Sequence, residues 1–305
     1  MAGGVEREIR HRIKSVQSTK KITRAMELIA ASRIVKAQQR VLAARPYIEQ
    51  LTEVIANLSR AGGGLTHPLL ETRDPVSTVG FVVITADRGL CGGYNTTMQR
   101  TAERAIAREK AAGRDYRLIA VGRKGNIFFR YRKYRIDGSY DGFSEKPTYE
   151  AAREIADDVM ARYESGEIDQ ARMIYTRFLS IGSQRATERQ FLPVDPDAIT
   201  ETVREDEAGS ASAYEFEPSP EEILVELLPR YVMARLFGAL LESAASEQVA
   251  RQRAMKAATD NANDLIKSLD RVANRARQDT ITTDLMEIVG GAEGMAQANA
   301  ASNAE

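Results

Sequence analysis

The sequence predicts a mixed fold: a long antiparallel coiled coil of the N- and C-terminal helices, plus a small Rossmann-like α/β domain encoded between them. Near both ends of the chain, apolar residues alternate in steps of three and four, which is the spacing of a coiled-coil seam. In the middle of the chain, short apolar runs alternate with helical patterns, which is typical of an α/β sheet. With 305 residues, of which 43% are hydrophobic, the chain has enough apolar material for one domain and an extended element.

The N-terminal helix is expected over residues 1–60. Its seam consists of Ile34, Ala37, Val41, Ala44, Ile48, Leu51, Ile55 and Leu58. Pro46 lies inside this helix, where its ring removes one backbone hydrogen bond and bends the axis. Residues 61–64 and the pair His67 and Pro68 then end the helix and open a linker.

The α/β domain is expected over residues 61–194. Residues 78–86 form an unbroken apolar run rich in β-branched side chains, as in a strand buried on both faces. Further strands are expected at 117–121, 171–179 and 189–194, and helices at 96–112 and 149–163. Because strands and helices alternate, we expect a small sheet that is at least partly parallel.

Three segments follow this domain. Residues 195–219 are expected to form an acidic connector, since the stretch 195–222 holds ten acidic residues and a single basic one, Arg204. Residues 220–290 are expected to form the C-terminal helix. Its seam consists of Met255, Ala258, Ala262, Leu265, Leu269, Val272 and Ala276. Residues 291–305 are small and polar, and we expect them to be a disordered tail.

The two terminal helices are expected to be antiparallel, because the first leads into the central domain and the second leads out of it. The second helix is longer, so its end should extend beyond the first as a single helix. That end carries five large apolar residues, Ile281, Leu285, Met286, Ile288 and Val289. An apolar surface on a lone helix is typical of a binding site for another molecule.

Charge, aromatic and cysteine content disfavour several classes of protein. The chain carries 43 basic and 43 acidic residues, but residues 1–45 hold eleven basic residues against three acidic ones. Aromatic side chains that stack on bases are nearly absent from this basic stretch, so single-stranded nucleic acid is disfavoured as a partner. Cys91 is the single cysteine, which fits a reducing compartment. No apolar run approaches the roughly 20 residues of a membrane-spanning helix, and we expect a soluble intracellular protein.

The clearest candidate for chemistry is the loop DRGLCGGYN at residues 87–95, between a predicted strand and a predicted helix. It lacks the spacing of phosphate-binding and dinucleotide-binding loops, so nucleotide binding is weakly supported. Cys91 would need a base to act as a nucleophile, and the chain offers only His11 and His67. A buried role is therefore favoured for Cys91. Neither histidine belongs to a cluster of metal ligands, and we expect no catalytic residue, metal site, cofactor or small-molecule substrate.

Four stretches resemble the γ subunit family of F-type ATP synthase, over essentially the whole chain. They are KKITRAMELIAASR at 20–33, DRGLCGGYN at 87–95, ESAASEQVARQRAMKAATDNA at 242–262 and ARQDTITTDLMEIVGGA at 276–292. The resemblance implies a non-catalytic rotor shaft that couples ion flow through a membrane ring to ATP synthesis or hydrolysis and regulates ATPase activity. One copy would turn inside a hexamer of three α and three β subunits. The α/β domain would rest on the ring of c subunits and hold the ε subunit, at the cytoplasmic face of the cell membrane.

The resemblance also implies which residues contact the hexamer. Positions that match coupling contacts with the α and β subunits are Met26, Arg251, Arg277, Gln278, Thr282 and Asp284. Asp284 stands where the family usually has a glutamate, so its carboxylate is on a shorter side chain. The apolar residues of 281–289 would turn in a sleeve formed by the hexamer.

Two other classes of function are compatible with the same residues. The seams also fit a coiled-coil scaffold with a ligand-sensing α/β head, which predicts a stable homodimer. Cys91 also fits a cysteine-dependent enzyme, which predicts a reactive thiol.

Overall fold

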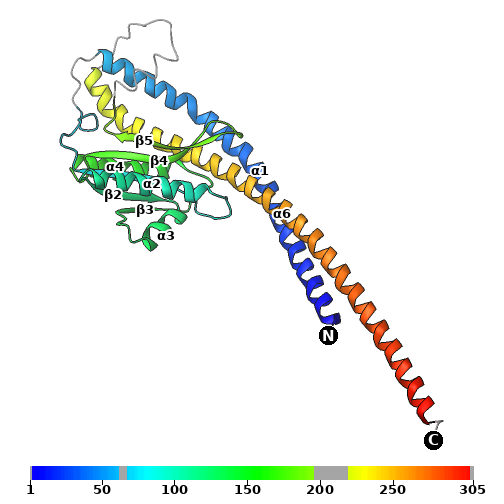
Figure 1. Cartoon of the computed structure of the whole chain (residues 1–305). Helices are drawn as coiled ribbons and strands as arrows, with labels where there is room; N and C mark the ends of the chain where they lie inside the picture. The colour runs from blue at the N-terminus through cyan, green and yellow to red at the C-terminus, as the bar shows by residue number, and fades with distance from the viewer. Residues whose placement is uncertain (1, 62–66, 196–218, 303–305) are drawn as a thin grey trace. The chain divides into compact units, whose positions relative to one another are not determined.

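The computed structural model describes residues 2–61, 67–195 and 219–302. Two helices account for the ends of the chain: α1 spans Ala2–Ala61 and α6 spans Pro220–Ser302 (Figure 1). The chain divides into two compact units. The helical unit comprises Met1–Leu28 with Met255–Glu305, and the α/β unit comprises Ile29–Ala254.

The α/β unit contains a five-stranded sheet with the strand order β3-β2-β1-β4-β5. The strands are β1 Thr78–Ile84, β2 Asp115–Val121, β3 Gly138–Tyr140, β4 Gln170–Phe178 and β5 Gln184–Leu192. The first four strands run parallel to their neighbours, and β5 is antiparallel to β4 at one edge. The sheet therefore confirms the predicted small and partly parallel α/β architecture.

Two helices cover one face of this sheet. They are α2, Tyr94–Ala111, and α3, Arg123–Tyr131. Both pack on the strands through an apolar cluster that includes Phe81 of β1, Met98 of α2 and Phe129 of α3.

The opposite face of the sheet is covered by α4, Tyr149–Glu164, together with parts of α1 and α6. Ile55 of α1, Val159 of α4 and Leu236 of α6 belong to one apolar cluster with the strands. Because both faces are covered, β1 is buried along almost its whole length. This burial explains why its sequence is an unbroken apolar run rather than an alternating one.

Within the α/β unit, α1 and α6 lie side by side and antiparallel. They share an apolar cluster made by Ile34, Ala37 and Val41 of α1 with Leu241, Ala245 and Val249 of α6. Further along α1 and further back along α6, a Cβ added at Gly238 would lie only 2.8 Å from Cδ1 of Ile48, so the glycine permits this close approach. All eight predicted seam residues of α1 are buried or half-buried, and this seam is confirmed.

In the helical unit, a buried hydrogen bond 2.8 Å long joins the hydroxyl groups of Thr23 in α1 and Thr259 in α6. The predicted seam of α6 is partly wrong here, because Leu265 and Val272 are 41% and 49% exposed. Between 255 and 276, the buried or half-buried positions are 255, 258, 259, 262, 263, 266, 269, 273 and 276. Five of the seven predicted seam residues are among them, and positions 266 and 273 are buried or half-buried where 265 and 272 were predicted. The small residues and the threonine pair occupy the contact, whereas hydrophobicity alone favoured the larger side chains.

The predicted end of the last helix is also wrong. Helix α6 does not stop at Gly290 but continues through Gly291 to Ser302, so residues 291–302 are helical rather than a disordered tail. A glycine costs about 1 kcal/mol in a helix relative to alanine, and the alanine-rich residues that follow are strong helix formers. Residues 196–218 of the predicted connector and 303–305 of the predicted tail lie outside the described residues.

Two elements of the α/β unit were not predicted. No helix was expected between the strand at 117–121 and the helix at 149–163, but α3 begins at Arg123. Gly122 enters this helix with φ 94° and ψ 137°, and this local glycine signal suggests a turn rather than a helix start. Strand β3 has only three residues, which is too short to display a period of two.

Candidate functional site

The loop 87–95 begins three residues after the end of β1 at Ile84 and leads into the first turn of α2. Its first residue, Asp87, holds it in place. The carboxylate of Asp87 accepts backbone hydrogen bonds from Arg123 at 3.0 Å, Gly142 at 3.0 Å and Ser144 at 2.9 Å. Burial alone would raise the pKa of Asp87, but these hydrogen bonds outweigh it and hold the pKa below its ordinary value. Asp87 is therefore an ionised acceptor that ties three segments of backbone together, and it is not poised as a general acid.

Cys91 lies inside this loop and is only 1% exposed. Its sulfur accepts a hydrogen bond from Nδ2 of Asn95 at 3.2 Å. Burial, followed by the nearby charge of Glu247, raises the pKa of the thiol. A raised pKa keeps the thiol protonated and unreactive, so the preferred prediction of a buried structural cysteine is confirmed. The histidine of the linker, His67, uses Nδ1 to accept a hydrogen bond from the backbone of Leu69 at 3.1 Å.

The same loop is clamped to α6 by a buried ion pair. Nη2 of Arg251 lies 2.6 Å from Oε1 of Glu247, one turn earlier on α6, and these residues are 5% and 1% exposed. Arg251 also donates to the carbonyl oxygens of Arg88 at 3.5 Å and Gly89 at 3.4 Å. Burial raises the pKa of Glu247, and Arg251 opposes this shift. The ion pair therefore joins the helix to the loop backbone.

Glu145, in the segment before α4, connects this ion pair to α1. Its carboxylate forms ion pairs with Arg33 of α1 at 2.5 Å, Arg88 of the loop at 3.5 Å and Arg251 of α6 at 3.7 Å. We call these residues, Arg33, Arg88, Glu145, Glu247 and Arg251, the loop-helix junction. The junction holds both long helices and the sheet-derived loop with one set of charges.

Arg251 was predicted as a contact with other subunits, and the structure places its side chain inside the α/β unit. Its polar contacts are with Glu247, Glu145 and the loop. Sequence reasoning missed Glu145 and Glu247 as its partners. The spacing of four residues between Glu247 and Arg251 on a helix was a usable signal for a pair on one face, whereas Glu145 lies in irregular chain and gave none.

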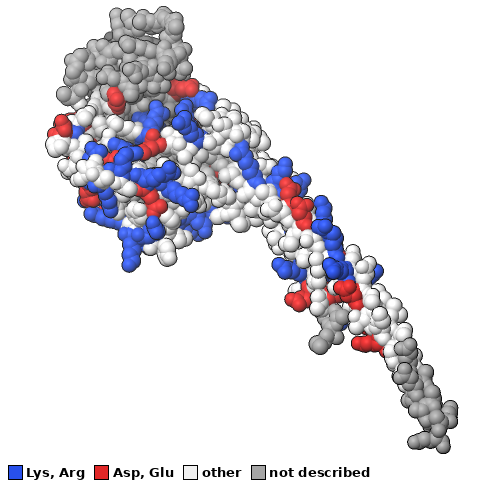
Figure 2. Space-filling model, viewed as in Figure 1, with Lys and Arg blue, Asp and Glu red and all other residues white. Residues whose placement is uncertain are grey.

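The other predicted contact residues belong to the helical unit. Met26 is half-buried on α1, and four polar residues of α6 are exposed: Arg277, Gln278, Thr282 and Asp284. The hydroxyl of Thr282 donates to the carbonyl oxygen of Gln278 at 2.9 Å. Charged side chains of both signs lie along the visible face of the helical unit (Figure 2).

The predicted apolar tip is an exposed stretch of α6. Every residue from 281 to 290 is exposed, including Ile281 at 49%, Met286 at 71% and Ile288 at 69%. Leu285 and Val289 are 57% and 55% exposed. Since exposure extends all round the helix, the described residues provide no partner for this stretch. So many large apolar side chains on one exposed segment indicate a contact with another molecule.

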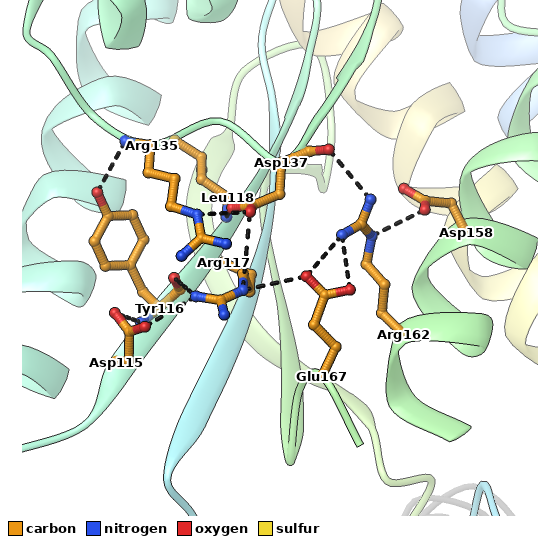
Figure 3. A network of polar contacts seen from close by, with 9 residues as sticks. All are labelled: Asp115, Tyr116, Arg117, Leu118, Arg135, Asp137, Asp158, Arg162 and Glu167. Carbon is orange, nitrogen blue, oxygen red and sulfur yellow. Dashed lines mark hydrogen bonds and ion pairs between the residues drawn. The ribbon is translucent and has the colours of Figure 1, made fainter. Parts of the chain in front are cut away.

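A second polar network lies at the start of β2 and the end of α4 (Figure 3). Its arginines are Arg117, Arg135 and Arg162, and its carboxylates are Asp115, Asp137, Asp158 and Glu167. Burial would lower the pKa of Arg117 and Arg162, but contacts with the carboxylates outweigh it and raise both pKa values. Mutually compensated charges of this kind connect structural elements and provide no free acid or base.

The described residues contain no group of three or more His, Cys, Asp and Glu side chains that could hold a metal ion. In the same part of the chain, none of the helices is both long and apolar enough to cross a bilayer. The candidate functional features are thus the exposed tip of α6, the polar residues beside it and the loop-helix junction.

Comparisons with known proteins agree on one family. Residues 6–295 match the family described as ATP synthase. The chain is 50% identical over 300 residues to the ATP synthase gamma chain of Frankia casuarinae, covering 97% of this chain and 99% of that protein. It is also 48% identical over 300 residues to the ATP synthase gamma chain of a Parafrankia species, with the same coverage. A chain from the OSCP, F1 and c-ring part of Euglena gracilis mitochondrial ATP synthase shares the fold, with a TM-score of 0.64, 19% identity and coverage of 96% of this chain and 95% of that chain.

Proposed function

Since the chain belongs to the ATP synthase gamma chain family, we propose that it is the central rotor shaft of an F1Fo ATP synthase and contributes no catalytic residue. The exposed apolar stretch 281–289 of α6 carries this proposal. Its side chains need an apolar environment that the described chain does not provide. A sleeve formed by a surrounding hexamer of three α and three β subunits meets that need.

The polar side chains beside the tip are proposed to couple rotation to catalysis. Arg277, Gln278, Thr282 and Asp284 are exposed on α6, so they are free to contact the subunits that pass them. A single asymmetric shaft presents a different face to each catalytic site. It can shift each site only by the difference between its contacts with that site's alternative conformations. The same contacts would allow the shaft to regulate ATP hydrolysis.

Met26 and the basic surface of α1 are proposed to take part in the same contacts. Met26 is half-buried, which leaves part of its flexible and polarizable side chain available to a passing subunit. The first 45 residues hold eleven basic residues against three acidic ones. We infer that this surface faces acidic segments of the β subunits, where exposed ion pairs are weak enough to break at every step of rotation.

Arg251 is proposed to act through the loop-helix junction rather than by touching the hexamer. Torque applied to the α/β unit has to reach α1 and α6 without slippage. A buried ion pair resists any movement that separates its two charges, because each charge would then be unpaired in a low-dielectric interior. The contacts of Glu145 with both helices support a role for the junction as the joint that transmits torque.

The α/β unit is proposed to be the foot of the shaft. The similar Euglena chain comes from an assembly of OSCP, F1 and the c-ring, which supports contact of this foot with a ring of c subunits. We further propose that the foot holds an ε subunit and that one copy of this chain serves each complex, peripheral to the cell membrane on its cytoplasmic face. Ion flow through the ring would then supply roughly 2.3 kcal/mol per elementary charge for each 100 mV.

The stoichiometry of the purified complex tests this function. An affinity tag on a non-gamma subunit and native mass spectrometry should yield one copy of this chain with three α and three β subunits. Light scattering of the isolated chain tests the scaffold alternative, which predicts a stable homodimer. Two copies of this chain per complex, or its absence from a complex that still couples ATP hydrolysis to ion pumping, would refute the rotor role.

A further inference from the structure

A cavity of about 910 Å³ lies inside the α/β unit, between α1, α6 and the β4-β5 hairpin. Four arginines line it: Arg45 of α1, Arg177 of β4, Arg189 of β5 and Arg235 of α6. This volume is in the range of small-molecule binding sites. The rotor function proposed above does not account for this cavity.

The arginines of the hairpin form no direct ion pair. In the described part of the chain, neither Arg177 nor Arg189 has an acidic side chain within 4.0 Å, although the charges of both act on Glu242 from further away. Arg177 also lies directly opposite Arg185 in the register of the two strands. Like charges in such a cross-strand pair destabilise a sheet, so a bound anion near Arg177 would relieve a repulsion that the chain itself leaves in place.

Arg235 approaches the cavity from α6. Its Nη2 donates to the carbonyl oxygen of Gln190 at 2.9 Å, and its guanidinium lies 5.5 Å from the ring centroid of Tyr231. Both partners are uncharged. Burial, with a contribution from the charge of Arg189, lowers the pKa of Arg235. An anion within reach of these two guanidinium groups would be stabilised by both of them.

Carboxylates also line the cavity, and most of them are already engaged. Glu49 pairs with Arg45 at 4.0 Å along α1, and Glu53 and Asp195 have interactions of their own. Glu242 accepts a hydrogen bond from the backbone of Phe178 at 3.2 Å. Four arginines and four carboxylates therefore line the cavity. Among the described residues, Arg177, Arg189 and Arg235 are the lining arginines that form no ion pair, so they are the cationic groups available to a ligand.

We propose that this cavity is a binding site for a small anion of the phosphate class, held by Arg177, Arg189 and Arg235. Planar guanidinium groups bind the oxygen atoms of phosphate in pairs, and three of them from different elements can surround a multiply charged group. The site lies against α1 and α6, so an occupied cavity would tie the β4-β5 hairpin to both helices. Inorganic pyrophosphate is a suitable probe, because it carries several negative charges and fits the volume.

The proposal can be tested by isothermal titration calorimetry of the full chain with pyrophosphate. The titration is done without divalent cations and at constant ionic strength. We expect one molecule to bind per chain, more tightly than inorganic phosphate. Replacing Arg177→Gln together with Arg189→Gln should weaken binding at least about tenfold, since each lost contact is a charged hydrogen bond. Both side chains are exposed, so their replacement leaves the apolar core intact, and thermal unfolding without anion checks this.

The matched control is Arg100→Gln, which removes an exposed arginine of α2 that does not line the cavity. This variant should keep its affinity within about twofold. An equal loss in the control would mean that diffuse charge, rather than the cavity, binds the probe. The proposal is also overturned if the unmodified chain binds no pyrophosphate at millimolar concentration, or if the double variant binds as tightly as the unmodified chain.

Discussion

Glu247 and Arg251 form an ion pair across one turn of α6, 2.6 Å long and almost completely buried. Desolvation of the two charges is offset only while both are present, because either charge alone would lie unpaired in a low-dielectric interior. The pair is also connected to the carbonyl oxygens of the loop 87–95 through Arg251. In the sequence this loop resembles a ligand-binding loop, but in the structure its backbone is bound to α6 through Arg251.

Substitution of Glu247→Gln should lower the free energy of unfolding by about 3–5 kcal/mol, since the buried guanidinium of Arg251 loses its closest anion and retains only the longer contact with Glu145 at 3.7 Å. The measurement is chemical denaturation of the full chain. Glu226→Gln is a matched control on the same helix, because Glu226 pairs with Arg230 across one turn at 3.8 Å but both side chains are mostly exposed. The control should cost no more than about 0.5 kcal/mol. Similar losses in the two variants would contradict the assignment of a buried structural pair.

Substitution of Gly122→Ala should lower the free energy of unfolding by at least about 2 kcal/mol, because few other residues adopt its backbone conformation. A Cβ at this position would also lie 2.2 Å from the carbonyl oxygen of Thr85. Gly113→Ala is the control: its φ is also positive, at 79°, but nothing lies within 4 Å of the added atom. It should cost about 1–2 kcal/mol from backbone strain alone. Equal values for the two variants would show that the steric contact with Thr85 is absent.

Cys91 should react with a maleimide at least about tenfold more slowly in the folded chain than in denaturant. The thiol is buried and its pKa is raised, so few thiolates are available to react. A control chain carrying Cys91→Ala and Ser268→Cys places a thiol at an exposed position of α6, and it should react rapidly in both conditions. Fast labelling of the folded natural chain would contradict the buried structural role and support the alternative function of a cysteine-dependent enzyme.

Replacing Arg277→Ala together with Gln278→Ala should reduce ion pumping per ATP hydrolysed while leaving thermal unfolding unchanged. Both side chains are exposed on α6, so their loss leaves the apolar core intact, and under the proposed function they contact other subunits. The measurement is ATP-driven pumping by the complex in vesicles, normalised to ATP hydrolysis. The pair Asn274→Ala and Arg275→Ala, also exposed on α6, is a control of nearly the same chemistry. An unchanged ratio in the first variant would remove Arg277 and Gln278 from the coupling contacts.

The stability of the α/β unit should fall as the pH drops below 3.8, the ordinary pKa of an aspartate. The folded pKa of Asp87 is lower than that value, so its contribution is complete above pH 3.8 and is lost as the pH falls through the folded pKa. Asp87→Asn should therefore reduce the dependence of the unfolding free energy on pH in this range. Asp141→Asn, on the neighbouring segment, serves as the control. The same acid dependence in the natural chain and the Asp87 variant would contradict this role for Asp87.

The sequence determined the elements whose residues repeat with a clear period or form a long apolar run. The α1 seam from Ile34 to Leu58, the buried strand β1 and the amphipathic helix α4 are all local patterns, and each was predictable because burial selects residue type at regular intervals. Membership of the family was also visible, since the four matching stretches preserve identities and not only patterns. The exposure of the large apolar residues in 281–289 was also predictable, because the longer C-terminal helix was expected to extend beyond its partner helix.

Tertiary structure alone decided which residues meet. The frame of the α6 seam depends on the contact of Thr23 with Thr259, residues that are far apart in the chain, so hydrophobicity counted along one helix selected Leu265 and Val272 wrongly. The burial of Arg251 depends on Glu145, which comes from irregular chain before α4. The arginines of the cavity come from four different elements. Charge compensation depends on distance in space, and a linear sequence specifies that distance only after the chain has folded.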